Sequence, residues 1–149
     1  MQNQLSLSAY VKRRNGVPLG AKHSMRNMLR RAFGAGAFPI FWHYWNPIWG
    51  FYLSRYVMKP LCRYLPPWLA VLVTFTVSGA LHDLAVSLVK WQWTLVFTPW
   101  FLLMGGGVVL SKFYAVSYAA YPWLVRAALN LLMIAATLSL SIAATGMAR

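Results

Sequence analysis

The chain has 149 residues, of which 60% are hydrophobic and only 10% are charged, and its 14 lysines and arginines face a single acid, Asp83. A water-soluble domain carries about 25% charged residues, so this length and composition favour one membrane domain over a soluble one. The basic residues flank long apolar runs instead of covering a polar surface, which argues against a nucleic-acid-binding protein and favours contact with anionic lipid.

Residues 1–40 form a basic lead, within which residues 12–31 hold seven of the fourteen basic side chains. The opening residues lack a basic segment followed by an apolar stretch, so we expect no cleaved signal peptide. Further along the lead, five apolar side chains have the spacing of one helix face: Met25, Met28, Leu29, Ala32 and Phe33. This pattern predicts an amphipathic helix on the membrane surface, ended by "GAGAFP" at 34–39.

Residues 38–58 are also apolar, but prolines, a glycine and Arg55 interrupt them. The stretch contains "FWHYWNP" at 41–47, where the polar side chains of His43 and Asn46 stand among aromatic rings. Such a cluster is either an anchor at the membrane interface, where Trp and Tyr concentrate, or part of a site. We predict a re-entrant or interfacial aromatic segment, which a bilayer tolerates only when it packs against protein.

Three later runs are long enough to cross the hydrocarbon core, which requires about 20 residues. They cover residues 68–89, 93–111 and 123–145, and the second contains Pro99 and three consecutive glycines. The predicted fold class is therefore an all-α membrane protein with about three transmembrane helices, which occupy a membrane domain at 41–149.

The basic residues predict the orientation of this multi-pass protein. Ten of the fourteen precede residue 66, Lys90 lies between the first two runs, Lys112 and Arg126 lie between the second and third, and Arg149 follows the third. A cytoplasmic N-terminus places twelve basic residues inside and two outside, which is the arrangement that the positive-inside rule favours.

The first run contains His82 and Asp83, the only strongly polar pair in the three runs. His82 lies about 10 Å from the end of the run, too deep to reach water easily. An ionisable group at this depth is a candidate functional residue, although a packed histidine that donates to a backbone carbonyl is an equal alternative. Asp83 points about 100° away from His82 and is expected to be structural, hydrogen-bonded to Ser87 or paired with a basic side chain.

The segments "FWHYWNP" and "TFTVSGALHDLAV" together resemble the paired motifs of the membrane-bound O-acyltransferases. Four residues fit the first motif: Phe41, Trp42, Trp45 and, at its final polar position, Asn46. Four fit the second: Val77, Ser78, Gly79 and His82. Asn46 and His82 are 36 residues apart, within the interval of that family, and the pattern is most similar to the sterol, diacylglycerol and wax acyltransferase branches. The resemblance spans roughly residues 25–90.

The resemblance implies transfer of an acyl group from a thioester, usually acyl-CoA, to a hydroxyl. Within this reading, His82 is the expected general base, because a neutral imidazole can take the proton of the attacking hydroxyl. Asn46 is its expected partner, which polarises the carbonyl oxygen or orients the acceptor. Trp42, Trp45 and Ser78 are expected to line the substrate site. Acyl-CoA enters as a co-substrate, and no other cofactor is expected.

Other polar residues carry weaker signals. Arg55, Lys59 and Arg63 recur every four residues and form a stripe, distorted by Pro60, that could hold the phosphates of CoA; contact with anionic headgroups is the preferred reading. His43 lies at a variable position of the first motif and is not expected to be catalytic. No metal site is expected, because no two histidines have ligand spacing and the single cysteine also excludes an intramolecular disulfide.

Three functions therefore stay open. The first is an O-acyltransferase, and the second is a non-catalytic membrane subunit or fragment that keeps the motifs for packing. A small transporter or channel subunit is the third. Members of the resembled family have further helices before the first motif, which here begins at residue 41. We therefore expect the chain to act as a homo-oligomer or beside a larger membrane partner.

Overall fold

The computed structural model describes residues 5–145, and within this range the secondary structure is helical without a strand. The predicted all-α fold is confirmed at this level. The elements are α1 (Leu7–Asn15), α2 (Ser24–Phe33), α3 (Phe38–Tyr44), α4 (Pro47–Leu53), the π-helix η1 (Ser54–Met58), α5 (Lys59–Leu61), α6 (Pro67–Lys90), α7 (Phe97–Phe113) and α8 (Trp123–Thr145). Arg149, which the orientation prediction places on the far side, lies outside the described residues.

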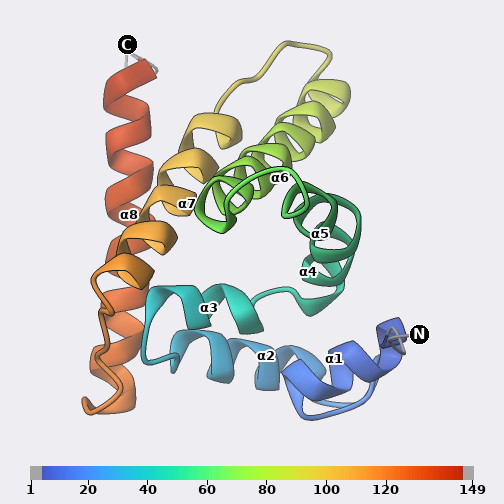
Figure 1. Cartoon of the computed structure of the whole chain (residues 1–149), viewed down its shortest axis with the longest axis vertical. Coiled ribbons are helices and arrows are strands. Elements are labelled where there is room, and N and C mark those ends of the chain that lie inside the picture. Colours follow the sequence, from blue (N-terminus) through green and yellow to red (C-terminus); the bar gives the residue numbers. More distant parts are fainter. Residues whose placement is uncertain (1–4, 146–149) are drawn as a thin grey trace.

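The basic lead folds into a layer of short helices, α1 and α2, with α3 beside them (Figure 1). The range of α2 agrees with the predicted amphipathic helix. The sequence reading missed α1, although Ser6 accepts a hydrogen bond from the N–H of Ala9 and Gly16 ends the helix at a φ of 81°. Asn15, at the end of α1, donates to the backbone and side-chain oxygens of Ser24 and so joins α1 to α2.

The predicted interfacial segment is a chain of short helices that bends repeatedly. Asn46 adopts a left-handed φ of 41°, and Pro47 then starts α4, where its missing N–H costs nothing. The chain widens into the π-helix at residues 54–58, immediately before α5, which contains Pro60. The predicted stripe of basic residues therefore does not follow the regular period of an α-helix, because this π-turn interrupts it.

The helices α6 and α7 run antiparallel as the closest pair in the molecule (Figure 1). At their shared end, one oxygen of Asp83 accepts hydrogen bonds from the N–H groups of Val96 and Phe97, both at 2.8 Å. Its other oxygen accepts from the backbone N–H and the hydroxyl of Thr98, at 2.7 and 2.6 Å. The structural role predicted for Asp83 is confirmed, but the predicted partners are wrong. Ser87 instead accepts from the N–H of Thr94.

Small residues let these two helices approach closely. A Cβ atom added to Gly79 of α6 would lie 2.6 Å from the carbonyl oxygen of Phe97, and one added to Gly105 of α7 would lie 2.9 Å from the Cβ of Phe75. Real Cβ atoms do not come this close to such neighbours. The absence of a side chain at Gly79 therefore permits the close packing of α6 against α7.

Two helices, α6 and α8, are long and apolar enough to cross a membrane by length and composition, with mean hydropathies of 1.7 and 1.9 over their most apolar windows. At 17 residues, α7 is about 25 Å long, which is shorter than a hydrocarbon core of about 30 Å. The second predicted span, residues 93–111, is therefore not confirmed. It begins later than predicted because Asp83 holds residues 96–98 at the helix start, which leaves 91–96 as a connection.

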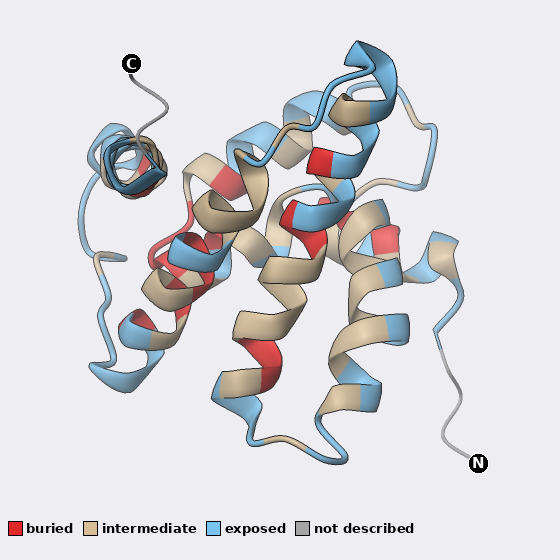
Figure 2. Ribbon diagram, turned by 90° about the horizontal axis from the view of Figure 1, so that it is seen from above, coloured by how far each residue is buried: buried red, intermediate tan, exposed pale blue. Residues whose placement is uncertain are grey.

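Much of the apolar surface of α6 and α8 is exposed. Figure 2 shows α8 nearly end-on beside the other helices, with most of its surface exposed or half-buried. Exposed apolar side chains on α8 include Leu124, Leu131, Leu132 and Leu140, and those on α6 include Leu84, Leu88 and Val89. Exposed apolar side chains on such long apolar helices are typical of contact with lipid or another apolar helix.

Candidate functional site

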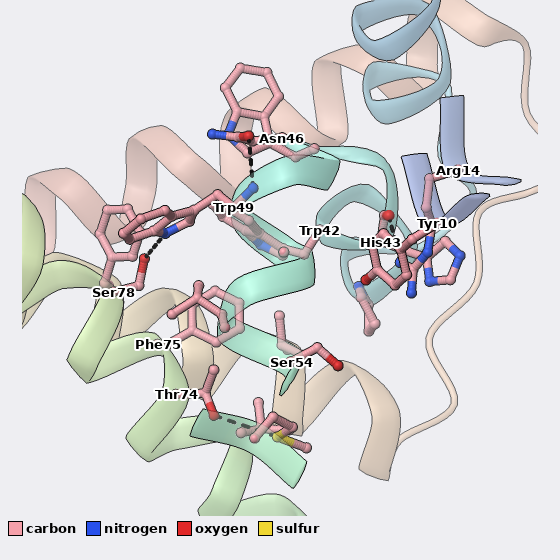
Figure 3. A pocket seen from close by; sticks show the side chains of 18 of the residues that line it. Tyr10, Arg14, Trp42, His43, Asn46, Trp49, Ser54, Thr74, Phe75 and Ser78 are labelled. Carbon is pink, nitrogen blue, oxygen red and sulfur yellow. Dashed lines mark hydrogen bonds between the residues drawn. The ribbon is translucent and has the colours of Figure 1, made fainter. Parts of the chain in front are cut away.

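A cavity of about 320 Å³ lies between the short helices and the α6–α7 pair. Its wall includes residues of α1, α3, α4, η1, α6 and α7, so segments far apart in the sequence meet there (Figure 3). Five of the seven predicted site residues line it: Trp42, Trp45, Asn46, Ser78 and His82. The other two, Arg55 and Lys59, are exposed and lie outside this lining.

A hydrogen bond and three aromatic rings surround the imidazole of His82. Its Nδ1 lies 2.7 Å from the carbonyl oxygen of Ser78, one turn earlier in α6. A carbonyl oxygen only accepts hydrogen bonds, so Nδ1 carries the proton and Nε2 keeps its lone pair in the neutral ring. The rings of Trp49, Phe97 and Phe101 surround the imidazole at centroid distances of 5.9, 5.6 and 5.1 Å.

This geometry combines the two alternatives left open by the sequence. His82 does donate to a backbone carbonyl, as a packed histidine would. The same hydrogen bond, however, selects the tautomer in which Nε2 can accept a proton, and the side chain lines a cavity. A structural bond at one ring nitrogen therefore leaves proton transfer possible at the other.

Trp49 connects the two sequence motifs. Its indole Nε1 donates to the hydroxyl of Ser78 at 2.9 Å, and its backbone N–H donates to the side-chain oxygen of Asn46 at 3.2 Å. Figure 3 shows the indole between the Asn46 side chain and Ser78. Asn46 is therefore connected to the turn that bears His82 through Trp49. The side-chain oxygen of Asn46 is used as the cap of α4, whereas its amide nitrogen takes no part in that cap.

The aromatic residues of the first motif form the inner wall of the cavity. Trp42 packs edge-on against Phe75 of α6 at 5.2 Å, and Trp45 stacks on Phe41 at 5.5 Å. Phe41 itself is 1% exposed. The Nε1 atom of Trp42 is buried without a hydrogen-bond partner among the described residues. A buried donor that has no acceptor carries a cost in free energy.

The basic residues that line the cavity are not the ones that the sequence indicated. Arg14 and Lys112 are part of its lining, and Nη1 of Arg14 donates to the carbonyl oxygen of His43 at 2.7 Å. His43 is exposed at the rim, where partial burial and the charges of Arg14 and Arg13 lower its pKa. The guanidinium of Arg55, for which contact with anionic headgroups or with the phosphates of CoA was predicted, lies over the ring of Phe51, at 5.7 Å.

The sequence reading did not single out Trp49 or Arg14. A signal for Trp49 was present, because Asn followed by Pro is a helix start, and the third residue of such a helix donates to the cap. No sequence signal pointed to Arg14, because it reaches the cavity through the packing of α1 against α4.

Within residues 5–145, no group of three or more His, Cys, Asp or Glu side chains is arranged to hold a metal ion. Comparison with protein-family models, with curated proteins and with solved structures gives no match to this chain. The resemblance to the membrane-bound O-acyltransferases therefore rests on the two motifs alone, and function has to be argued from the cavity and its residues.

Proposed function

We propose that the chain is a membrane O-acyltransferase that moves an acyl group from a thioester, such as acyl-CoA, to a hydroxyl. The observation that carries this proposal is the meeting of the two motifs at one cavity, where Trp49 connects Asn46 to the helix turn that holds His82. A packing role alone would not require a histidine whose hydrogen bond leaves Nε2 without a partner beside a cavity.

The reaction follows from this tautomer. Nε2 of His82 takes the proton of the acceptor hydroxyl while the hydroxyl oxygen attacks the thioester carbonyl carbon. The C–S bond of the tetrahedral intermediate then breaks, and the leaving thiolate receives the proton from the imidazolium. Base catalysis of this kind contributes about 10² to 10⁴ in rate.

Two donors at the cavity are suited to the oxygen that becomes negative in the intermediate. The indole N–H of Trp42 lacks a partner within the described part of the chain. The amide nitrogen of Asn46 is not part of the cap, which uses only the side-chain oxygen. Donors fixed before the reaction stabilise developing charge most effectively.

A second candidate function is that of a non-catalytic subunit in a larger membrane assembly. The size of the cavity favours it, because about 320 Å³ lies near the lower end of ligand sites, which range from about 300 to 1,000 Å³. This space suits the reacting groups but not a long acyl chain together with the pantetheine arm. If the chain is active, the remainder of the donor would lie in lipid or against a partner, either a second copy or a larger protein.

The test is acyl transfer from radiolabelled acyl-CoA in membranes that contain the chain. We expect His82→Ala to lower the rate by about 10² to 10⁴ without loss of insertion, whereas His43→Ala, at the rim of the same cavity, changes it little. Equal turnover by wild type and His82→Ala at equal expression would exclude His82 as the base. Absence of transfer by wild type, restored on addition of a co-purifying membrane protein, would favour the subunit.

We also propose that the protein spans the membrane more than once with its basic lead in the cytoplasm. In Figure 1 the α1–α3 layer lies at one end of the molecule, and the connection between α6 and α7 lies at the other. The single basic residue next to that connection is Lys90, in contrast to the seven in residues 12–31. A cysteine placed at residue 19, where Leu19 is exposed, in a chain that lacks Cys62 should resist impermeant reagents added outside intact cells. Labelling there would place the basic lead outside the cell and contradict the proposed orientation.

A further inference from the structure

A second cavity, of about 590 Å³, lies where α2 and the α2–α3 turn meet the first turn of α8. The side chains that give it its character are three arginines, Arg30, Arg31 and Arg126, together with Asn27, Tyr44 and Trp123. It shares none of its lining with the cavity that contains His82. Its chemistry is therefore separate from the proposed acyl transfer.

Three arginines line this second cavity, and no carboxylate in its lining balances their charges. The lining contains no acidic residue, and the only acid in the sequence, Asp83, is bonded to the start of α7. Arginines brought together in this way repel each other unless an anion lies between them. An anion from outside the chain would both remove this repulsion and accept hydrogen bonds from several guanidinium forks.

Arg126 also has an unmet hydrogen-bonding requirement. Its Nε is buried and lacks a partner among residues 5–145. Arg126 is half-buried and lies in the first turn of α8, where the positive end of the helix dipole adds to the attraction for an anion. A phosphate in this cavity would meet the Arg126 side chain, which is part of the lining.

The walls of this second cavity are held in place by hydrogen bonds and close contacts. Nε1 of Trp123 donates to the carbonyl oxygen of Arg30 at 3.0 Å, and a Cβ added to Gly34 would lie 2.5 Å from that same nitrogen. Nη1 of Arg31 donates to the carbonyl oxygen of Arg14, and its guanidinium lies 5.8 Å from the ring of Tyr44. The guanidinium of Arg31 is therefore positioned before a ligand arrives, which reduces the entropy lost on binding.

We propose that this second cavity binds the phosphate headgroup of an anionic phospholipid, with the acyl chains directed along the exposed apolar face of α8. Trp123 starts a helix long enough to cross a bilayer, so the arginines lie at headgroup depth if α8 spans the membrane. Basic pockets beside membrane helices on the cytoplasmic side are suited to anionic headgroups. The inference rests on the proposed membrane position of α8 and not on acyl transfer.

The experiment is native mass spectrometry of the purified full chain in a neutral detergent that contains equal amounts of phosphatidylglycerol, phosphatidylcholine and oleate. We expect wild type to retain phosphatidylglycerol selectively. The double variant Arg30→Gln/Arg126→Gln should bind it about tenfold less tightly or weaker. Arg26→Gln is the matched control, because it removes one positive charge from the same helix at a position outside the cavity lining, and it should retain the lipid as wild type does.

Three results would overturn the proposal. Equal retention of oleate and phosphatidylglycerol would indicate attraction by surface charge alone, and equal loss in Arg26→Gln would indicate the same. Displacement of the lipid by 10 mM inorganic phosphate, with the phosphate itself retained, would assign the cavity to a soluble anion. If the double variant does not fold, Arg30→Gln alone serves, because that side chain is exposed and its loss should still weaken binding.

The failure of this proposal can be separated from failure of the acyl-transfer proposal. His82→Ala leaves the arginines unchanged, so it should retain phosphatidylglycerol in full while losing transfer. Retention of the lipid by a chain with no transferase activity would support the headgroup site and leave the subunit as its function.

Discussion

His82 and Asp83 are neighbours in α6, yet the regions that they face differ in how completely polar groups are satisfied. Asp83 is 4% exposed and accepts four hydrogen bonds from residues 96–98. His82 makes one hydrogen bond, from Nδ1 to the carbonyl oxygen of Ser78 in its own helix, and its side chain lines a cavity. A fully bonded buried group fixes structure, whereas a partly bonded one beside an open space is available for chemistry.

The largest expected effect on stability comes from removing the hydrogen bonds that Asp83 accepts. Asp83→Ala removes the acceptor of three backbone N–H groups and one hydroxyl, and we expect a loss of about 3 kcal/mol or more in the free energy of unfolding. Asp83→Asn keeps one carbonyl oxygen and should lose less. Unfolding in mixed detergent micelles with increasing dodecyl sulfate, followed by circular dichroism, measures both. A loss below 1 kcal/mol in the alanine variant would contradict the role of Asp83 as the cap of α7.

The next effect concerns the close contact that supports the same corner. Gly79→Ala places a methyl group 2.6 Å from the carbonyl oxygen of Phe97, so α6 and α7 must separate at a cost of about 1 to 3 kcal/mol. Gly106→Ala is the matched control, since a Cβ there meets nothing within 4 Å and should be neutral or stabilising. The same unfolding measurement compares them. Equal stabilities of the two variants would contradict the tight packing described at this corner.

A smaller effect is expected at Trp49, which lines the cavity beside His82. Trp49→Phe removes the indole donor to Ser78 but keeps an aromatic ring beside His82, so we expect a loss of about 1 kcal/mol in stability and a reduced rate of transfer. Trp93→Phe, at a residue that is 96% exposed, should change neither quantity. An unchanged rate in Trp49→Phe would show that the link between the motifs is not needed for the chemistry.

The smallest effect is a change in the pH dependence of stability. Because the pKa of His43 is lowered in the folded protein, the unfolded chain binds its proton first as the pH falls through the ordinary value of about 6.5. The native state therefore loses stability below that pH. His43→Gln should show a smaller difference between pH 7.5 and pH 5.5 than wild type, because His23 and His82 are common to both. An identical difference would contradict the lowered pKa.

The long helices could be predicted from local pattern because their length and apolarity are properties of the segments themselves. The range 123–145 agrees with α8, and 68–89 agrees with α6 to within one residue at each end. The run at 93–111 was misplaced because an acid thirteen to fifteen residues earlier decides where α7 begins. Nothing within "WTLVFTP" indicates that Asp83 accepts those N–H groups, since it depends on how the two helices are packed.

The candidate site was predictable in part for a similar reason. Asn46 and His82 carried motif signals, and both line the cavity. The stripe of Arg55 and Lys59 followed from a regular helical period, which the π-turn at 54–58 does not keep. Trp49 and Arg14 become visible only when α1, α4 and α6 are brought together, because a single sequence does not state tertiary contacts.

The hydrogen bonds of Asn130 affect the order in which parts of the protein fold. Its amide nitrogen donates to the carbonyl oxygens of Phe33 and Ala35, and its side-chain oxygen accepts from Tyr118, all at a residue that is 0% exposed. The contacts with residues 33 and 35 close a loop of more than ninety residues. During synthesis, the turn after α2 therefore lacks its partner until α8 has left the ribosome. We expect the α1–α3 layer to remain open to chaperones and proteases until that late step, and to close only when the last helix docks.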